Sequence, residues 1–311
     1  MASKLKSFAM ELRASFLTAT VISIVLGTSI AWARNGVFDL GIFLLSLLSG
    51  SFLHLGTNTA NDYFDYKSGG DNINKEYVRP FGGGSRMIQL GLLKPREVLL
   101  ETAILYIVGI VIGIYLAFSK GAFVLVIGLI GLFSGFFYSS PPFKLANRGI
   151  GEIFIGVNFG VLMTLGSYYV QTQTLSVESL IASIPVSLLI LAVVYINEFQ
   201  DYNADKVIEK RTLVVRLGRK KAAQGYAMLL SAAYMSIFIG LLSRIMPSST
   251  FIGLFTIPIA IKAATVAFRY HSTPLKLVPA NESTILCHLI TGLLLSVGYL
   301  VAFIAPSSLF V

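Results

Sequence analysis

Two short acidic stretches, residues 61–71 and 197–205, carry the side chains best suited to chemistry. Each follows a long apolar run, in a chain where only 13% of the residues are charged. The first contains Asn61, Asp65 and Asp71, and the second contains Asn197, Asp201 and Asp205. Residues four apart lie on one face of a helix, so the 61/65 and 197/201/205 spacings predict two polar stripes of amide and carboxylate oxygens.

Oxygen ligands without neighbouring His or Cys suit a hard cation such as Mg²⁺. This ion takes one or two protein carboxylates and completes its shell with water and substrate phosphates. We therefore predict that the two stretches face each other and hold Mg²⁺, and through it a diphosphate. The predicted metal-binding and catalytic residues are Asn61, Asp65, Asp71, Asp201 and Asp205. A plainer interpretation, solvated acids after helix ends, does not explain the helical spacing in both stretches.

Basic residues lie within or after both stretches, as expected if a polyanion binds between them. They are Lys67 within the first stretch, Arg79 and Arg86 after it, and Lys210 and Arg211 after the second. Three glycines lie between Arg79 and Arg86, a composition that lets backbone N–H groups approach a phosphate. A flexible turn also explains the glycines, and the cytoplasmic excess of basic residues in membrane proteins explains many of the cations. We predict these five cations as substrate-binding residues.

The 311-residue chain is 55% hydrophobic, with a mean hydropathy of +0.77. Soluble domains carry about 25% charged residues, and a membrane-spanning helix needs about 20 apolar residues. We therefore expect an all-α polytopic membrane protein with nine transmembrane helices around a central cavity. The predicted spans are 16–33, 41–60, 98–117, 122–139, 152–170, 180–199, 223–243, 251–269 and 285–305. They form one domain, residues 1–311, with motif-bearing halves at about 1–139 and 140–311.

Lysine and arginine counts predict the orientation of these spans. With the N-terminus in the cytoplasm, 20 of the 24 basic residues fall on the cytoplasmic side and 3 on the other, while Lys262 lies within a span. Both acidic stretches then face the cytoplasm. This topology accounts for the net charge of +9, so no nucleic-acid partner is expected. The single cysteine, Cys287, excludes an internal disulfide.

The paired motifs resemble those of the UbiA superfamily of intramembrane prenyltransferases. The resemblance rests on Asn61-Asp62-x-x-Asp65-x5-Asp71 and on Asp201-x3-Asp205 with Lys210-Arg211-Thr212-Leu213. It continues in Tyr138-Ser139-x-Pro141-Pro142-Phe143-Lys144 and covers nearly the whole chain. Segments 151–156 and 166–172 look most like the menaquinone branch, which prenylates dihydroxynaphthoate. Many family members place the last acid of the first motif four residues after the middle one, a position occupied here by Gly69. In this chain the acid comes at Asp71, a spacing that suits the menaquinone branch and counts against a hydroxybenzoate enzyme.

The resemblance implies Mg²⁺-dependent transfer of a prenyl group from an isoprenyl diphosphate to an aromatic acceptor, within a lipid bilayer. Metal ions and cations stabilise the leaving diphosphate, and aromatic faces steady the allylic cation. Tyr138 is a candidate for the aromatic role, and Lys144 is expected to reach the diphosphate or the acceptor. Asn158 is expected to contact the acceptor or to bond a neighbouring helix. Asn197 completes the predicted substrate-binding set.

Alternatives from two classes stay open at this point. Within prenyl transfer, the acceptor could instead be an ether-lipid glycerol phosphate or another quinone or porphyrin precursor. From a different class, a cation-coupled secondary transporter also shows internal repeats and intramembrane acids. Transporters place such acids near the bilayer midplane, whereas here they follow the ends of two spans beside basic loops. We therefore favour the enzyme.

Overall fold

The computed structural model describes residues 2–79 and 81–305, and every regular element in those two ranges is a helix. Eight helical segments of this part of the chain are long and apolar enough to cross a membrane. A further apolar helix, α6 (Phe123–Phe136), has 14 residues and is shorter than the other spans. The predicted all-α membrane architecture is confirmed, with eight full-length spans and one short apolar helix where nine spans were expected.

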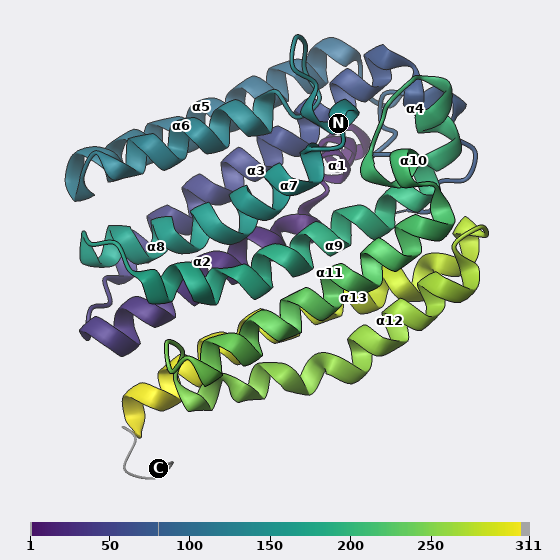
Figure 1. The fold of residues 1–311 in the computed structure, drawn as a ribbon. Helices are drawn as coiled ribbons and strands as arrows, with labels where there is room; N and C mark the ends of the chain where they lie inside the picture. Colours follow the sequence, from purple (N-terminus) through teal and green to yellow (C-terminus); the bar gives the residue numbers. More distant parts are fainter. Residues whose placement is uncertain (1, 80, 306–311) are drawn as a thin grey trace.

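The long helices lie side by side in one bundle (Figure 1). Their bounds are α2 (Thr18–Asn35), α3 (Leu40–Ser68), α5 (Pro95–Lys120), α7 (Gly151–Gly156) continuing through the π-helical η3 (Val157–Leu162) into α8 (Met163–Thr172), α9 (Val177–Val207), α11 (Arg219–Leu242), η4 (Ser248–Thr256) continuing into α12 (Ile257–Tyr270), and α13 (Val278–Ile304). Shorter helices connect or precede them: α1 (Ala2–Glu11), η1 (Ala14–Leu17), α4 (Gly70–Ile73), η2 (Leu145–Arg148), α10 (Leu213–Leu217) and η5 (Pro274–Leu277).

Two helices extend well beyond the predicted spans. Helix α3 continues to Ser68 and α9 continues to Val207, so both acidic stretches are helical where the apolar runs have already ended. Hydropathy marks only the part of a helix that lies in lipid, which explains the difference. Gly69 ends α3 with φ +80°, a conformation that favours glycine, and α4 then places Asp71. Gly69 therefore interrupts the helix between the end of α3 at Ser68 and the start of α4 at Gly70.

The buried core is unevenly distributed between the two sides of the bundle. The largest cluster of buried apolar side chains joins α2, α9, α11, α12 and α13, and it includes Leu26, Val186 and Tyr226. On the other side, a much smaller cluster joins α3, α5, α6 and α8 around Leu116 and Val170. An apolar cavity occupies the space beside this small cluster. The first side therefore forms a rigid framework, and the second side encloses room for a ligand.

Close contact between α2 and α8 depends on Gly27. A Cβ atom at this position would lie 2.2 Å from the carbonyl oxygen of Thr164, which is backbone and has no rotamer with which to move away. We expect Gly27→Ala to lower the free energy of unfolding by about 1–3 kcal/mol, the usual cost of overpacking. The check is the melting temperature in detergent. Gly113→Ala is the control, because its Cβ would meet only Ser49 Oγ at 3.4 Å. Equal melting temperatures for the two variants would contradict this packing argument.

Candidate active site

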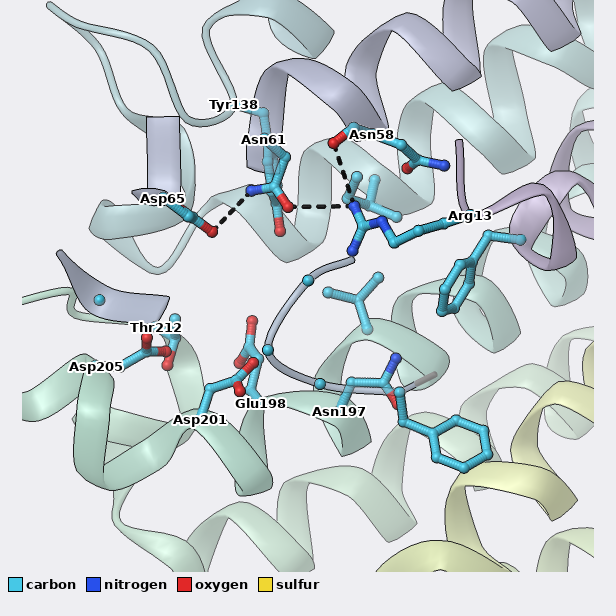
Figure 2. Close-up of a pocket in the computed structure, with 18 of the residues that line it drawn as sticks. Arg13, Asn58, Asn61, Asp65, Tyr138, Asn197, Glu198, Asp201, Asp205 and Thr212 are labelled. Atoms are coloured by element: carbon cyan, nitrogen blue, oxygen red, sulfur yellow. Dashed lines mark hydrogen bonds between the residues drawn. The ribbon is translucent and has the colours of Figure 1, made fainter. Parts of the chain in front are cut away.

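A polar pocket lies where the acidic ends of α3 and α9 meet (Figure 2). Its wall includes Arg13 from the N-terminal segment and the glycines of loop 82–84. Eight of the residues predicted for the site line it: Asn61, Asp65, Asp71, Tyr138, Asn197, Asp201, Asp205 and Lys210. The structure thus brings the two stretches together from positions 136 residues apart, as counted between Asp65 and Asp201.

Hydrogen bonds hold the α3 side of the pocket in place. The Nδ2 of Asn61 donates to Asp65 Oδ2 at 3.0 Å and to Ser139 Oγ at 2.7 Å. Beyond the helix end, Asp71 Oδ2 accepts from Gln89 Nε2 at 2.9 Å. The amide of Asn61 therefore fixes the Asp65 carboxylate and ties α3 to the loop after α6.

Lys210 bridges the two acidic stretches. Its Nζ lies 3.6 Å from Asp65 Oδ2 and 3.7 Å from Asp205 Oδ1, while Asn74 Nδ2 donates to Asp201 Oδ1 at 2.6 Å. Burial disfavours the charged ammonium, but the surrounding carboxylates of Asp205, Asp65 and Asp201 outweigh burial and hold the pKa of Lys210 well above its usual range. Lys210 is therefore a permanent cation at the centre of the site.

Loop 82–84 passes between the two acidic stretches, where Figure 2 shows it crossing the pocket. A Cβ atom on Gly82 would lie 2.9 Å from Gln200 Oε1 and 3.1 Å from Asp201 Oδ1. A Cβ atom on Gly84 would lie 2.7 Å from Asp62 Oδ1, and the φ of +65° at Gly84 also favours glycine. Only glycines allow the backbone to approach both sets of carboxylates this closely.

The oxygen-rich wall fits Mg²⁺ held partly by substrate. Asp205 Oδ2 is buried and has no hydrogen-bond partner, so this oxygen is available to a cation. Among the described residues, no three His, Cys, Asp or Glu side chains converge closely enough to hold a metal alone. A cation here would need water or substrate oxygens to complete its shell, which is the usual coordination of Mg²⁺ in enzymes that handle phosphates.

Five predicted substrate-binding cations do not line the polar pocket: Lys67, Arg79, Arg86, Lys144 and Arg211. Three have other partners. Lys67 Nζ lies 5.3 Å from the centre of the Tyr63 ring, Arg86 stacks on Tyr77 at 4.0 Å, and Arg79 donates to the carbonyl of Ser85. Of the other two, Arg211 is exposed and Lys144 is half-buried. Near the glycines, Arg79 and Arg86 thus brace the loop from outside the pocket.

Asn158, predicted to contact the acceptor or a neighbouring helix, lies in a second, apolar cavity. It belongs to the π-helical turn η3, donates through Nδ2 to Ser134 Oγ of α6 at 2.7 Å, and leaves Oδ1 buried without a partner. This cavity, of about 330 Å³, is enclosed mainly by α3, α5, α6, η3 and α8. His54, Tyr138 and Phe159 are among the residues that line both it and the polar pocket, so the two adjoin.

Sequence reasoning missed several polar residues of the pocket wall, among them Arg13, Asn74 and Glu198. Arg13 was included only among the basic residues counted on the cytoplasmic side. Its guanidinium donates to Asn61 Oδ1 at 3.3 Å and lies 3.7 Å from Asp62 Oδ1. Nothing local in the sequence marks a contact between residues 48 positions apart. Glu198 did carry a signal, because it is an acid beside Asn197 on the same helix.

Crowding of carboxylates predicts a pH effect on stability. Burial, with the nearby charges of Asp65 and Asp62, raises the pKa of Asp71 from 3.8 to about 8. The folded state therefore binds a proton that the unfolded state releases, so stability falls as pH rises between these values. In metal-free buffer we expect the melting temperature to rise by about 2–4 °C when pH is lowered from 8.5 to 6.5. Asp71→Asn should flatten this dependence of melting temperature on pH. An unchanged pH dependence in that variant would show that a group other than Asp71 causes the effect.

Comparison with known proteins identifies the family of this chain. A sequence model described as the UbiA prenyltransferase family matches residues 20–278. The chain is 29% identical to a 1,4-dihydroxy-2-naphthoate octaprenyltransferase of Bacillus subtilis, covering 92% of this chain and 90% of that protein. It is 28% identical to the enzyme of the same name from Escherichia coli, covering 95% and 96%.

The fold also matches a solved structure of a UbiA homolog from Archaeoglobus fulgidus bound to GPP and Mg²⁺. The TM-score is 0.62 at 16% identity, covering 94% of this chain and 99% of that one. This likeness concerns the arrangement of the helices, while the sequence match spans most of the chain, both acidic stretches included. The chain belongs to the UbiA prenyltransferase family.

Proposed function

We propose that this protein transfers a prenyl group from an isoprenyl diphosphate to 1,4-dihydroxy-2-naphthoate, with Mg²⁺, in menaquinone synthesis. The carrying observation is that a pocket of carboxylates around Lys210 adjoins an apolar cavity. A diphosphate head fits the first and an isoprenoid tail fits the second. One transmembrane domain would supply this site, with one acidic stretch from each half. Family membership favours the enzyme over the transporter considered above.

The polar pocket would bind the diphosphate through both acidic stretches. Asn61, Asp65 and Asp71 would hold Mg²⁺ on the α3 side, and Asp201 and Asp205 would hold it on the α9 side. The bound ion supplies electrostatic neutralisation of the leaving diphosphate. Lys210 and Arg13 both line the pocket and add N–H donors, and such positive charge stabilises a departing anion without further rearrangement.

Breaking the carbon–oxygen bond of the diphosphate ester leaves an allylic cation at the junction of the two cavities. Tyr138 and Phe159 line both cavities there, and aromatic rings stabilise cations. The acceptor ring carbon then bonds to the allylic carbon, and aromaticity returns when that ring carbon releases the group it carried, a proton or a carboxylate as CO₂. The apolar walls keep water from quenching the cation.

The acceptor assignment rests on the relatives and on the motif spacing. Both the Bacillus subtilis and the Escherichia coli relatives are named for 1,4-dihydroxy-2-naphthoate. Such an acceptor is planar and anionic, and so suits a pocket that presents Arg13 together with aromatic side chains. The excess of Lys and Arg near the acidic ends supports a pocket that opens to the cytoplasm, with the N-terminus on the same side.

An assay with purified protein in detergent tests the proposal. It combines Mg²⁺, a labelled isoprenyl diphosphate and a panel of acceptors that includes 1,4-dihydroxy-2-naphthoate, 4-hydroxybenzoate and a glycerol phosphate. We expect prenylated naphthoate product only when Mg²⁺ is present. Transfer to another acceptor alone would correct the acceptor, and folded protein that neither binds the diphosphate nor transfers it would refute the activity.

A further inference from the structure

The side chain of Asn197 points its nitrogen into the polar pocket, as Figure 2 shows. Its oxygen is already engaged, because Asn197 Oδ1 accepts a hydrogen bond from Asn281 Nδ2 at 2.7 Å. Asn281 lies on α13 and is completely buried. With the oxygen turned toward Asn281, the N–H groups of Asn197 are the part of its amide that faces the pocket.

A second buried amide continues the same direction of donation at Asn281. Gln200 Nε2 donates to Asn281 Oδ1 at 3.2 Å, and Gln200 is also completely buried. Donation therefore runs in one direction, from Gln200 to Asn281 to Asn197 and on into the pocket. Reversing any one amide would bring two oxygens or two N–H groups together away from water, which costs the full desolvation penalty of both groups.

The asparagine of the first stretch is oriented the other way. Asn61 uses its Nδ2 on Asp65 and Ser139, and its Oδ1 faces the Arg13 guanidinium. The two asparagines occupy similar places in the two sequence motifs, yet Asn61 turns to the pocket side an oxygen that accepts from Arg13, whereas Asn197 turns its N–H groups to the pocket. A metal ion binds the oxygen of an amide and not its nitrogen.

We propose that Asn281 is a positioning residue that makes Asn197 a hydrogen-bond donor to an anionic oxygen of the substrates, and not a metal ligand. This inference rests on the proposed function and assigns a role to Asn197 in the wall of the polar pocket. The anionic oxygen belongs either to the diphosphate or to the carboxylate of the aromatic acceptor. Both present the same chemistry to an N–H group.

Asn197→Asp separates a donor from a metal ligand, because it keeps the shape and replaces the N–H groups by an acceptor. We expect the KM of one substrate to rise about 10–100-fold, with no tightening of Mg²⁺ half-saturation. A rise for the prenyl diphosphate identifies its phosphate as the bound anion, and a rise for the naphthoate identifies the carboxylate. Unchanged KM values with tighter Mg²⁺ half-saturation would overturn the proposal.

A double-mutant cycle tests whether Asn281 acts through Asn197. We expect Asn281→Leu to raise the same KM about tenfold in the native background and less than about twofold in the Asn197→Ala background. Equal effects in both backgrounds would show a merely structural role and overturn the positioning claim. Thr284→Val is the matched control, because Thr284 is buried one turn away on α13 and bonds Tyr226 instead. It should lower the melting temperature without changing either KM.

A binding measurement keeps this inference separate from the activity. Thermal shifts of each variant are recorded with Mg²⁺-pyrophosphate and, separately, with 1,4-dihydroxy-2-naphthoate. We expect Asn197→Asp to reduce one of the two shifts. If Asn197→Asp reduces a thermal shift that the native chain shows, but the native chain transfers no prenyl group, the proposed function fails and the donor role stands. If Asn197→Asp leaves both shifts intact, the donor role fails.

Discussion

Asp201→Asn and Asp65→Asn are each expected to lower kcat by about 10²–10³-fold, the usual loss when one preorganised electrostatic group is removed from an active site. Each substitution keeps the shape of the side chain and removes one negative charge from the pocket between α3 and α9. The half-saturating Mg²⁺ concentration should rise in both variants, because an amide oxygen is a weaker ligand than a carboxylate. Initial rates over a Mg²⁺ titration measure both quantities.

The same variants are expected to fold at least as well as the native chain in metal-free buffer. The carboxylates of Asp65, Asp201 and Asp205 surround one cation, Lys210, and therefore repel one another when no metal is bound. Removing one of them relieves that repulsion, so activity and stability should change in opposite directions. Asp39→Asn is the control, since Asp39 caps the far end of α3 and Asn is an equally good cap. Normal turnover in either pocket variant would refute the assigned metal site.

Helical spacing made much of the site predictable. Asn61 and Asp65 of α3 are four residues apart, as are Asp201 and Asp205 of α9, and the resemblance to a family pattern adds Tyr138. The apolar runs likewise predicted the positions of the membrane helices, because a run of about twenty apolar residues is the length that crosses a bilayer as a helix. These features depend on local periodicity, which one sequence displays directly.

Contacts between helices distant in sequence were not predictable in this way. Asn281 and Asn197 are 84 positions apart, and their hydrogen bond depends on how α13 packs against α9. Arg13 reaches the pocket only because the N-terminal segment packs against α3. Conversely, Lys67 lies within the first acidic stretch and Arg211 shortly after the second, yet neither lines the pocket. Distance along the chain does not show which way a side chain points at a helix end.

Filling the apolar cavity should change the length of prenyl chain that the protein accepts. Gly128 and Gly131 of α6 both line this cavity, and a Cβ atom at either position would meet no other atom within 4 Å. We therefore expect Phe to be tolerated at either site and to occupy space otherwise open to the isoprenoid tail. With Gly131→Phe, kcat/KM for an octaprenyl diphosphate should fall by at least about 100-fold relative to that for a geranyl diphosphate.

The two positions should act at different depths. Gly131 lies seven residues and Gly128 ten residues before Tyr138, where the two cavities adjoin, which corresponds to about 10 and 15 Å along a helix. Gly128→Phe should therefore permit a longer chain than Gly131→Phe does. Competition between diphosphates of graded length measures the cut-off, with Gly128→Ala and Gly131→Ala as controls that add only a methyl group. Identical chain-length profiles for both Phe variants and the native chain would place the isoprenoid tail outside this cavity, whereas an ordered pair of cut-offs would establish α6 as the wall that measures it.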